Sequence, residues 1–241
     1  MKKESTGKIH PISDTIRQIS QIFIDLDFSI ADGPYVEDSF HNFDALNVPP
    51  DHPSRDMQDT FYLPVVDDAG KNKVLRTHTS NVQIRFMEEL LARGGRPPFK
   101  LIAPGKVFRN EATDATHEAQ FYQVEGLVVG RGVSLANLKW TLEHFIKKIL
   151  GEDVEIRLRP GFFPFVEPGV EVDLKFCGKW MEVLGAGMVH PNVFRSVGID
   201  PAEYSGFAFG VGVDRIMMMK YGITDARYSY TGDLRLHYGI K

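Results

Sequence analysis

The sequence predicts an α+β fold, in which helices pack against an antiparallel β-sheet. Two observations predict this class: apolar residues recur at helical spacing in three segments, and apolar and polar residues alternate in several others. Short turns join the alternating segments, which indicates antiparallel pairing, because parallel strands need a long crossover. The 241 residues are enough for one substantial core, and we expect a single domain over residues 1–241.

Three segments are expected to form amphipathic helices. Residues 13–27 carry apolar side chains at intervals of three and four, with Ser13 or Asp14 as the candidate N-cap. The second helix is expected over residues 80–93 and the third over residues 134–150, since glycine follows each of these apolar patterns.

Strands are predicted where apolar and polar side chains alternate. Residues 154–158 and 170–176 show this alternation, and residues 177–179 are expected to form a hairpin turn into a further strand. Both ends of the segment 108–126 are also expected to be strands, joined by a loop at its polar middle. Residues 40–62 are rich in Pro, Asp and His and are expected to form an ordered loop.

The composition excludes several classes of protein. No apolar run is long enough to span a bilayer, and no apolar signal segment follows the first residues, so we expect a cytoplasmic protein. A net charge of -4 without a basic stripe indicates that any nucleic acid would contact mainly another domain or chain. The single cysteine, Cys177, excludes an internal disulfide and a cysteine-rich zinc site, and we expect it to be a buried thiol.

One face of the strand that ends the segment 108–126 carries an unusual row of side chains. Phe121, Gln123 and Glu125 are two residues apart, so they point to the same side of a strand. A solvated surface explains such a row. The other interpretation is the floor of a pocket for an ammonium group, because carboxylate and amide oxygens both accept hydrogen bonds.

Two arginines are candidates for binding anions. Arg109 shares a strand face with Glu111, which fits an ordinary salt bridge as well as a bidentate grip on a phosphate. Arg215 follows the glycine-rich residues 205–212 at the start of an apolar helix, where it needs an anionic partner, either a carboxylate or a phosphate. These glycines match neither the GxGxxG fingerprint nor a P-loop.

Longer strings resemble the class II aminoacyl-tRNA synthetases. FRNE at 108–111 resembles motif 2, GVGVDR at 210–215 resembles motif 3, and Gly33-Pro34, before Tyr35, resembles motif 1. Further strings are typical of the α subunit of the bacterial-type phenylalanine enzymes, and they occur in that family's order. They are FHNFDALNVPPDHPSRDMQDTF (40–61), LRTHTS (75–80), THEAQFYQVEG (116–126), RPGFFPFVEPGVEVD (159–173), EVLGAGMVHPNV (182–193) and GFAFGVGVDR (206–215).

The resemblance implies an ATP site with two catalytic residues, Arg109 and Arg215. Arg109 would bind the α-phosphate and stabilise the charge that develops at phosphorus, and Arg215 would lie near the γ-phosphate. Glu111 would read the amine of adenine, and His117 would contact the outer phosphates. Phe121 and Arg215 would sandwich the adenine. The implied ATP-binding residues are Arg109, Glu111, His117, Phe121, Gly212 and Arg215.

The resemblance also implies a pocket for phenylalanine. Phe163 and Phe165 would meet the substrate ring edge-to-face, an arrangement that aromatic pairs favour. The small side chain of Ala208 would limit what fits at the para position of the ring. The implied residues are His78 and Ser80 for the polar end, Gln123 and Glu125 for the ammonium, and Phe163, Phe165, Val166 and Ala208 for the ring.

The resemblance implies the reaction and its partners. The carboxylate of phenylalanine would attack the α-phosphorus of ATP and release pyrophosphate, and the phenylalanyl group would then pass to tRNA(Phe). Mg²⁺ would accompany ATP, with Glu182 as the candidate ligand. The implied partners are a β subunit, in an α₂β₂ heterotetramer, together with tRNA(Phe), ATP and L-phenylalanine, and no membrane.

The chain also departs from the family. The N-terminal coiled coil that reaches tRNA in the family is not found, so we expect a truncated or unusually short form. Gln58 stands where some members have tryptophan, and the C-terminal residues diverge. Two rivals follow: a paralogue that kept adenylation without tRNA, and a binding module without catalysis, against which the retained polar residues speak.

Overall fold

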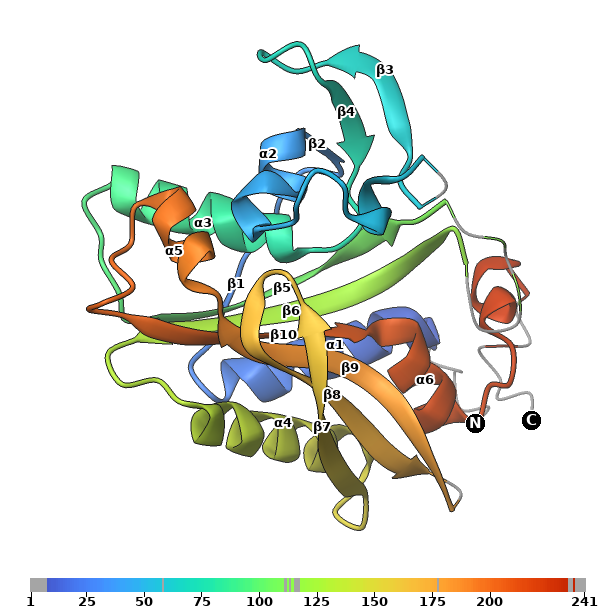
Figure 1. Cartoon of the computed structure of the whole chain (residues 1–241). Helices are drawn as coiled ribbons and strands as arrows, with labels where there is room; N and C mark the ends of the chain where they lie inside the picture. The colour runs from blue at the N-terminus through green and yellow to red at the C-terminus, as the bar shows by residue number, and fades with distance from the viewer. Residues whose placement is uncertain are drawn as a thin grey trace, which may run out of the picture.

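A seven-stranded β-sheet crosses the molecule and separates two layers of helices (Figure 1). The computed structural model describes residues 8–57, 59–110, 112, 114, 118–176, 178–233 and 236. The strands, in their order across the sheet, are β1 (Ser29–Ile30), β5 (Phe99–Phe108), β6 (Gln120–Gly130), β10 (Ser205–Gly212), β9 (Lys179–Val189), β8 (Val166–Phe176) and β7 (Glu155–Phe163).

Antiparallel pairing dominates this sheet, which confirms the predicted α+β class. β1 and β5 pair in parallel, and the neighbouring pairs from β5 to β7 are antiparallel. The predicted turn between β8 and β9 is also present, since Phe176 pairs with Lys179 and Gly178 has a φ of 77°. Left-handed backbone of this kind suits glycine, which has no Cβ. Cys177 lies outside the described residues, so its expected burial stays a prediction.

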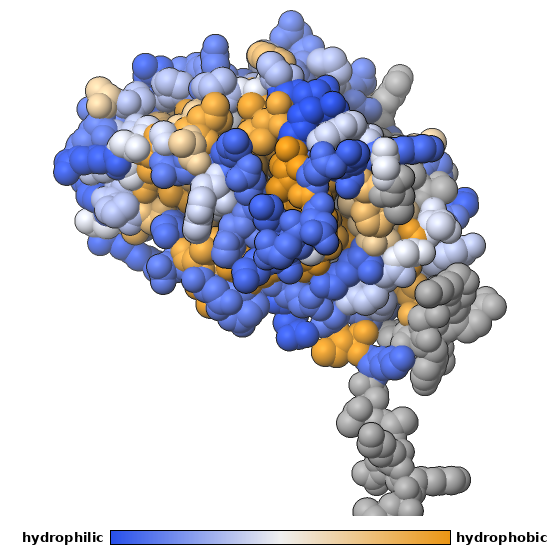
Figure 2. All heavy atoms as spheres, turned by 90° about the horizontal axis from the view of Figure 1, so that it is seen from below, coloured by the Kyte–Doolittle hydropathy of each residue, from blue (hydrophilic) through white to orange (hydrophobic). Residues whose placement is uncertain are grey.

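Three helices cover the lower face of the sheet in Figure 1: α1 (Pro11–Ile24), α4 (Leu135–Leu150) and α6 (Val213–Tyr221). Their apolar sides meet the sheet in one core, where the ring of Phe23 stacks on Phe209 at 5.2 Å between centroids. Seen from below, the molecule is mainly hydrophilic with apolar patches between the polar side chains (Figure 2). This is the pattern of amphipathic helices that bury one side.

The helix predictions are confirmed except at the ends of α1. Its N-cap is His10, whose Nδ1 accepts a hydrogen bond from the backbone N–H of Ile12, and the N-cap predicted at Ser13 or Asp14 is wrong. Proline at the first helical position, Pro11, fixes a helical φ and needs no N–H partner, so the helix starts earlier. The helix also ends earlier than predicted, at Ile24.

The upper layer of Figure 1 contains α2 (Ser39–Asn42), α3 (Ser80–Ala92) and α5 (Pro191–Val197), together with a small antiparallel sheet. That sheet is formed by β2 (Val36–Glu37), β4 (Asn72–Leu75) and β3 (Tyr62–Val66). The segment 40–62, predicted as an ordered loop, contains most of α2 and the short 3-10 helices η1 (Asp44–Leu46) and η2 (Pro53–Arg55).

Several short elements of the upper layer were not predicted. The hairpin of β3 and β4 has exposed valines that break the alternation, and α5 has only 7 residues. Such short elements depend on contacts with the rest of the chain rather than on a long periodic pattern. No described helix combines the length and the apolar character that crossing a membrane requires.

Gly126 marks the tightest contact between the central strands. It pairs with Phe209 across β6 and β10, and a methyl group added at Gly126 would overlap the Phe209 ring. Phe209 is buried between β10 and α1, so its ring has little room to move away.

We therefore predict that Gly126→Ala lowers the free energy of unfolding by about 2 kcal/mol or more, since overpacking forces rotamer and backbone shifts. Gly130→Ala, on the same strand, is the control, because the added methyl would make only ordinary contacts at 3.4 Å or more. Urea denaturation of both variants measures the difference, and equal stability of the two would contradict the packing described here.

Candidate active site

A cavity of about 600 Å³ lies between the upper face of the large sheet, the helix α3 and the turn between β7 and β8. Apolar side chains line one part of this cavity, and charged side chains line another. It brings together most of the residues that the sequence singled out, although they come from distant parts of the chain. Those on its wall are His78, Ser80, Arg109, Gln123, Glu125, Phe163, Phe165, Val166, Glu182, Ala208 and Arg215.

Glu125 forms the polar floor of the cavity, at the middle of β6. Its Oε1 accepts a hydrogen bond of 3.0 Å from the backbone N–H of Thr79, and its Oε2 accepts one from the hydroxyl of Ser80. Gln83 donates a longer bond of 3.4 Å to the same Oε2. Gln123 lies two residues away on the same face, so the predicted parity is correct and the solvated-surface interpretation is wrong.

Burial makes Glu125 a weaker acid than an ordinary glutamate. Loss of hydration raises its pKa from 4.5 to about 7, although the hydrogen bonds from Ser80 and Thr79 and the charge of Arg109 oppose the shift. The carboxylate is therefore costly to ionise at this position. A cationic group bound beside it would offset that cost.

Two more hydrogen-bond acceptors are buried near this floor. Among the described residues, Oε1 of Gln123 and Nδ1 of His78 have no hydrogen-bond partner. The Nε2 of His78 lies 3.1 Å from the carbonyl oxygen of Asn42, which can only accept, so Nε2 carries the proton and Nδ1 is an acceptor. Burial, together with the charge of Arg109, lowers the pKa of His78 to about 4, which keeps its ring neutral.

The apolar part of the cavity is built by the turn between β7 and β8. The rings of Phe163 and Phe165 lie 6.0 Å apart between centroids and are stacked at 26°. Phe163 lies directly over β9, because a Cβ at Gly185 would come within 2.7 Å of its ring. Ala208 on β10 belongs to the same wall. A flat apolar group would fit this part of the cavity.

Two arginines also line the cavity. Arg109, at the end of β5, donates to the carbonyl of Thr77 at 3.3 Å, and its guanidinium lies 5.0 Å from the ring centroid of Phe121. Arg215, at the start of α6, donates to the carbonyl of Glu182 at 2.6 Å. Both side chains are half-buried, so each can offer donors to an anionic group in the cavity.

The start of α6 is fixed by its neighbours. Asp214 accepts a hydrogen bond of 2.9 Å from the backbone N–H of Tyr122 and one of 2.6 Å from the hydroxyl of Tyr230, in the 3-10 helix η3 (Ala226–Tyr230). These bonds tie α6 to β6 and hold Arg215 beside the cavity. Phe121 and Gly212 are next to these residues, but they are not part of the cavity wall. Glu111 and His117 lie outside the described residues.

Comparison with known proteins identifies the family. The family model of the class II core domain of tRNA synthetases, described as type F, matches residues 1–240. The chain is 50% identical over 242 residues to phenylalanine–tRNA ligase alpha subunits of Bacillus mycoides, Bacillus cytotoxicus and Bacillus cereus, covering 95% of this chain and 68% of each relative. The chain belongs to the phenylalanine–tRNA ligase α-subunit family.

Further residues that were not predicted from the sequence line the cavity of this class II synthetase. Gln83 and Met87 line the cavity from α3, and they lie on the same side of the helix as Ser80. Spacings of three and four residues place side chains on one face, so this signal was present in the sequence. Phe43 and Leu46, in contrast, come from short elements with no periodic pattern.

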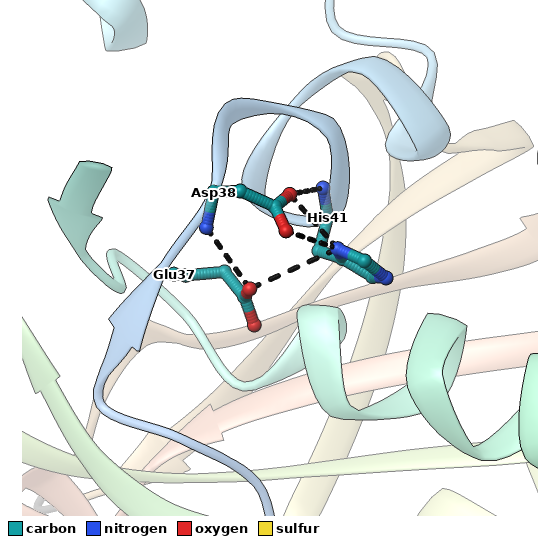
Figure 3. Close-up of side chains that lie close together, drawn as sticks. All are labelled: Glu37, Asp38 and His41. Atoms are coloured by element: carbon teal, nitrogen blue, oxygen red, sulfur yellow. Dashed lines mark hydrogen bonds and ion pairs between the residues drawn. The ribbon is translucent and has the colours of Figure 1, made fainter. Parts of the chain in front are cut away.

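A second cluster in this synthetase, Glu37, Asp38 and His41, has the groups that could hold a metal ion (Figure 3). Its groups are already engaged. Arg85 donates to both carboxylate oxygens of Glu37, and His41 contacts Asp38 at 2.8 Å and Glu88 at 2.9 Å. Because Arg85 supplies the positive charge, we assign this cluster to the fold, where it joins β2, α2 and α3.

The raised pKa of Glu125 predicts how stability changes with pH. In the unfolded chain this carboxyl ionises near pH 4.5, whereas in the folded protein it stays protonated up to about pH 7. Its contribution to stability is therefore present at low pH and is lost as the pH rises through 7, by about 2 kcal/mol between pH 5 and pH 8. Glu125→Gln, which cannot ionise, should lose about 2 kcal/mol less over the same interval.

The measurement is urea unfolding of both proteins at pH 5 and pH 8, without amino acid or ATP. Comparing the change with pH, rather than the absolute stability, removes any packing difference between the two side chains. An identical change with pH in the two proteins would contradict the buried state of Glu125.

Proposed function

We propose that this chain activates L-phenylalanine with ATP to form phenylalanyl-adenylate and, together with a β subunit, transfers the phenylalanyl group to tRNA(Phe). The observation that carries the proposal is the division of one cavity into three parts. It offers buried acceptors for an ammonium, an apolar wall for a flat ring and two arginines for an anion. Phenylalanine beside the phosphates of ATP has these three chemical features in one assembly.

The amino acid would bind with its ammonium at the floor. Glu125 and Oε1 of Gln123 would accept its hydrogen bonds, and His78 and Ser80 would hold the polar end. The ring would extend to Phe163, with Phe165, Val166 and Ala208 closing that part of the pocket. In this proposal the carboxylate would point toward Arg109 and Arg215, which line the same cavity.

The reaction would then be an in-line displacement at phosphorus. A carboxylate oxygen forms a bond to the α-phosphorus, the bond between that phosphorus and the bridging oxygen breaks, and pyrophosphate leaves with the electron pair. Arg109 would stabilise the charge on the α-phosphate and Arg215 would hold the outer phosphates. Catalysis by these residues would consist of positioning and electrostatic stabilisation, without a covalent enzyme intermediate.

Mg²⁺ would supply further positive charge to the phosphates when it is bound. Glu182 fits as its protein ligand, because its half-exposed side chain lines the cavity. The backbone carbonyl of the same residue accepts a hydrogen bond from Arg215, so Glu182 lies beside that arginine. Magnesium commonly uses one or two carboxylates, with waters and phosphates as the other ligands. Glu111, His117, Phe121 and Gly212 stay in the proposed ATP site on the strength of the motifs alone.

The partners in this proposal are a β subunit, in an α₂β₂ heterotetramer, and tRNA(Phe) in the cytoplasm. The relatives are named alpha subunits, which supports a partner subunit. Exposed apolar side chains at Tyr35, Val36 and Phe40 follow the string that resembles motif 1. They offer a surface for the β subunit. The net charge of -4 favours phosphate contacts that lie mainly on other parts of the assembly.

The proposal predicts phenylalanine-dependent exchange of pyrophosphate into ATP, measured with Mg²⁺ and the purified chain, alone and with a bacterial β subunit. Arg109→Gln should reduce kcat/KM by about a hundredfold or more, because it removes a donor to the charged transition state. Arg93→Gln, an exposed arginine on the surface, is the matched control and should leave the rate unchanged. No exchange under either condition, by folded protein, would overturn the proposed activation.

A second prediction concerns the size of the ring pocket. Ala208→Gly removes the methyl group that faces the cavity, so para-chlorophenylalanine should gain about tenfold in kcat/KM relative to phenylalanine. Ala103→Gly, a buried strand alanine that does not line the cavity, is the control and should keep the wild-type preference. An unchanged preference in Ala208→Gly would contradict the placement of the ring, and amino-acid-dependent exchange measures both.

A further inference from the structure

Arg76 is a completely buried arginine whose described hydrogen-bond acceptors are neutral carbonyls, although the charges of Asp32, Glu125 and Glu37 also act on it. Its exposed fraction is 0%. Its Nε donates to the carbonyl of Lys106 at 2.8 Å, and its Nη1 donates to the carbonyl of Gly33 at 3.0 Å. A buried guanidinium held by carbonyl groups is costly, since desolvation opposes its charge and lowers its pKa. Such an arrangement needs a reason beyond packing alone.

The guanidinium joins three segments that are far apart in the sequence. They are the surface loop at residues 33–35, the end of β5, and residues 76–80, which we call the site strap. The backbone repeats these connections, because the N–H of Arg76 donates to the carbonyl of Tyr35 at 2.9 Å and its carbonyl accepts from Phe108 at 2.9 Å. Arg76 is thus fixed at both its backbone and its side chain.

The site strap carries much of the polar end of the cavity. Thr79 and Ser80 bind the carboxylate of Glu125, and His78 presents its unpartnered Nδ1. The carbonyl of Thr77 also receives Nε of Arg109 at 3.3 Å. A shift of the strap would therefore move the two donors to Glu125 from Thr79 and Ser80, together with Nδ1 of His78.

Arg76 contacts a side chain that reaches the surface, that of Tyr35. The ring of Tyr35, which is 51% exposed, lies 4.8 Å from the Arg76 guanidinium and 6.0 Å from the ring of Phe108. Contacts of the first kind are attractive, because the face of the ring is negative. Tyr35 therefore links the exposed apolar face near β2 to the strap and to the strand that carries Arg109.

We propose that Arg76 is a positioning residue for the amino-acid end of the site, which fixes the site strap to β5 and to the surface loop beneath Tyr35. The inference rests on the proposed function, since it concerns how that site binds phenylalanine. Arg76 contacts no substrate and acts through Thr79, Ser80 and His78. Lysine would not reproduce it, because its donors all leave one nitrogen, whereas Nε and Nη1 of the planar guanidinium reach the carbonyls of Lys106 and Gly33 in fixed, separate directions.

Glycine at position 105 supports this assignment. A Cβ at Gly105 would overlap Nη2 of Arg76, so β5 approaches the guanidinium as closely as backbone allows. That Nη2 is buried without a hydrogen-bond partner among the described residues. The close approach of β5 thus holds the guanidinium in one position, although its Nη2 makes no hydrogen bond with the described residues.

The test is steady-state pyrophosphate exchange by the chain with its β subunit, for wild-type protein, Arg76→Lys, Tyr35→Leu and Arg85→Lys. We expect Arg76→Lys to raise KM for phenylalanine at least tenfold while KM for ATP changes no more than threefold. Tyr35→Leu should raise KM for phenylalanine about threefold. Arg85→Lys, on α3 and paired with Glu37 away from the cavity, should leave both KM values unchanged at a comparable loss of stability.

The outcomes separate this inference from the proposed function. A wild-type protein that shows no exchange would overturn both. An active wild-type protein, with KM for phenylalanine unchanged in Arg76→Lys or with both KM values raised in proportion, would overturn the positioning role alone. If Arg76→Lys does not fold, Tyr35→Leu decides, because a half-exposed position tolerates the change. It is assayed with the β subunit at a saturating concentration, since Tyr35 also belongs to the surface proposed for that subunit, and an unchanged KM for phenylalanine would then overturn the inference.

Discussion

The burial of the Glu125 carboxylate is the constraint on which the rest of the site depends. An acidic group removed from water needs donors, and Thr79 and Ser80 provide them from the strap that leads into α3. The position of α3 on the sheet is therefore tied to the chemistry of the floor. Because these donors only partly replace the lost hydration, Glu125 keeps a raised pKa and an affinity for positive charge. The floor of the cavity therefore presents hydrogen-bond acceptors to which a cationic group could donate.

The sheet makes room for this site by omitting side chains. A Cβ at Gly210 would come within 3.1 Å of both Gln123 and Glu125, and Gly187 gives the same room to Val166 on the neighbouring strand. The strands β6, β10 and β9 thus place their larger side chains on the lower face, against α1, α4 and α6, where the main core forms. One face of the sheet forms the main core, and the other lines the cavity in which we propose that the substrates bind.

The sequence predicted what depends on local periodicity and on recognisable motifs. Parity placed Gln123 and Glu125 on one face, and apolar spacing placed α3 and α4 correctly. Prediction from the sequence failed where long-range contacts determine the local structure, as at the early start of α1 and at the short helix α5. The neutral tautomer of His78 follows from a carbonyl 36 residues away in the sequence, and the buried state of Arg76 follows from three separate segments. Neither could be deduced from neighbouring residues.

In the proposed function, the floor of the cavity binds the ammonium of phenylalanine through the ionised form of Glu125. The most direct measurement is calorimetry of phenylalanine binding in two buffers with different ionisation enthalpies, which counts the protons released. With a pKa of about 7 for Glu125 before phenylalanine binds, we expect release of nearly one proton at pH 6 and almost none at pH 8.5. The ligand 3-phenylpropionate, which lacks the ammonium, should release none. Binding of phenylalanine at pH 6 without proton release would show that ionised Glu125 does not bind the ammonium.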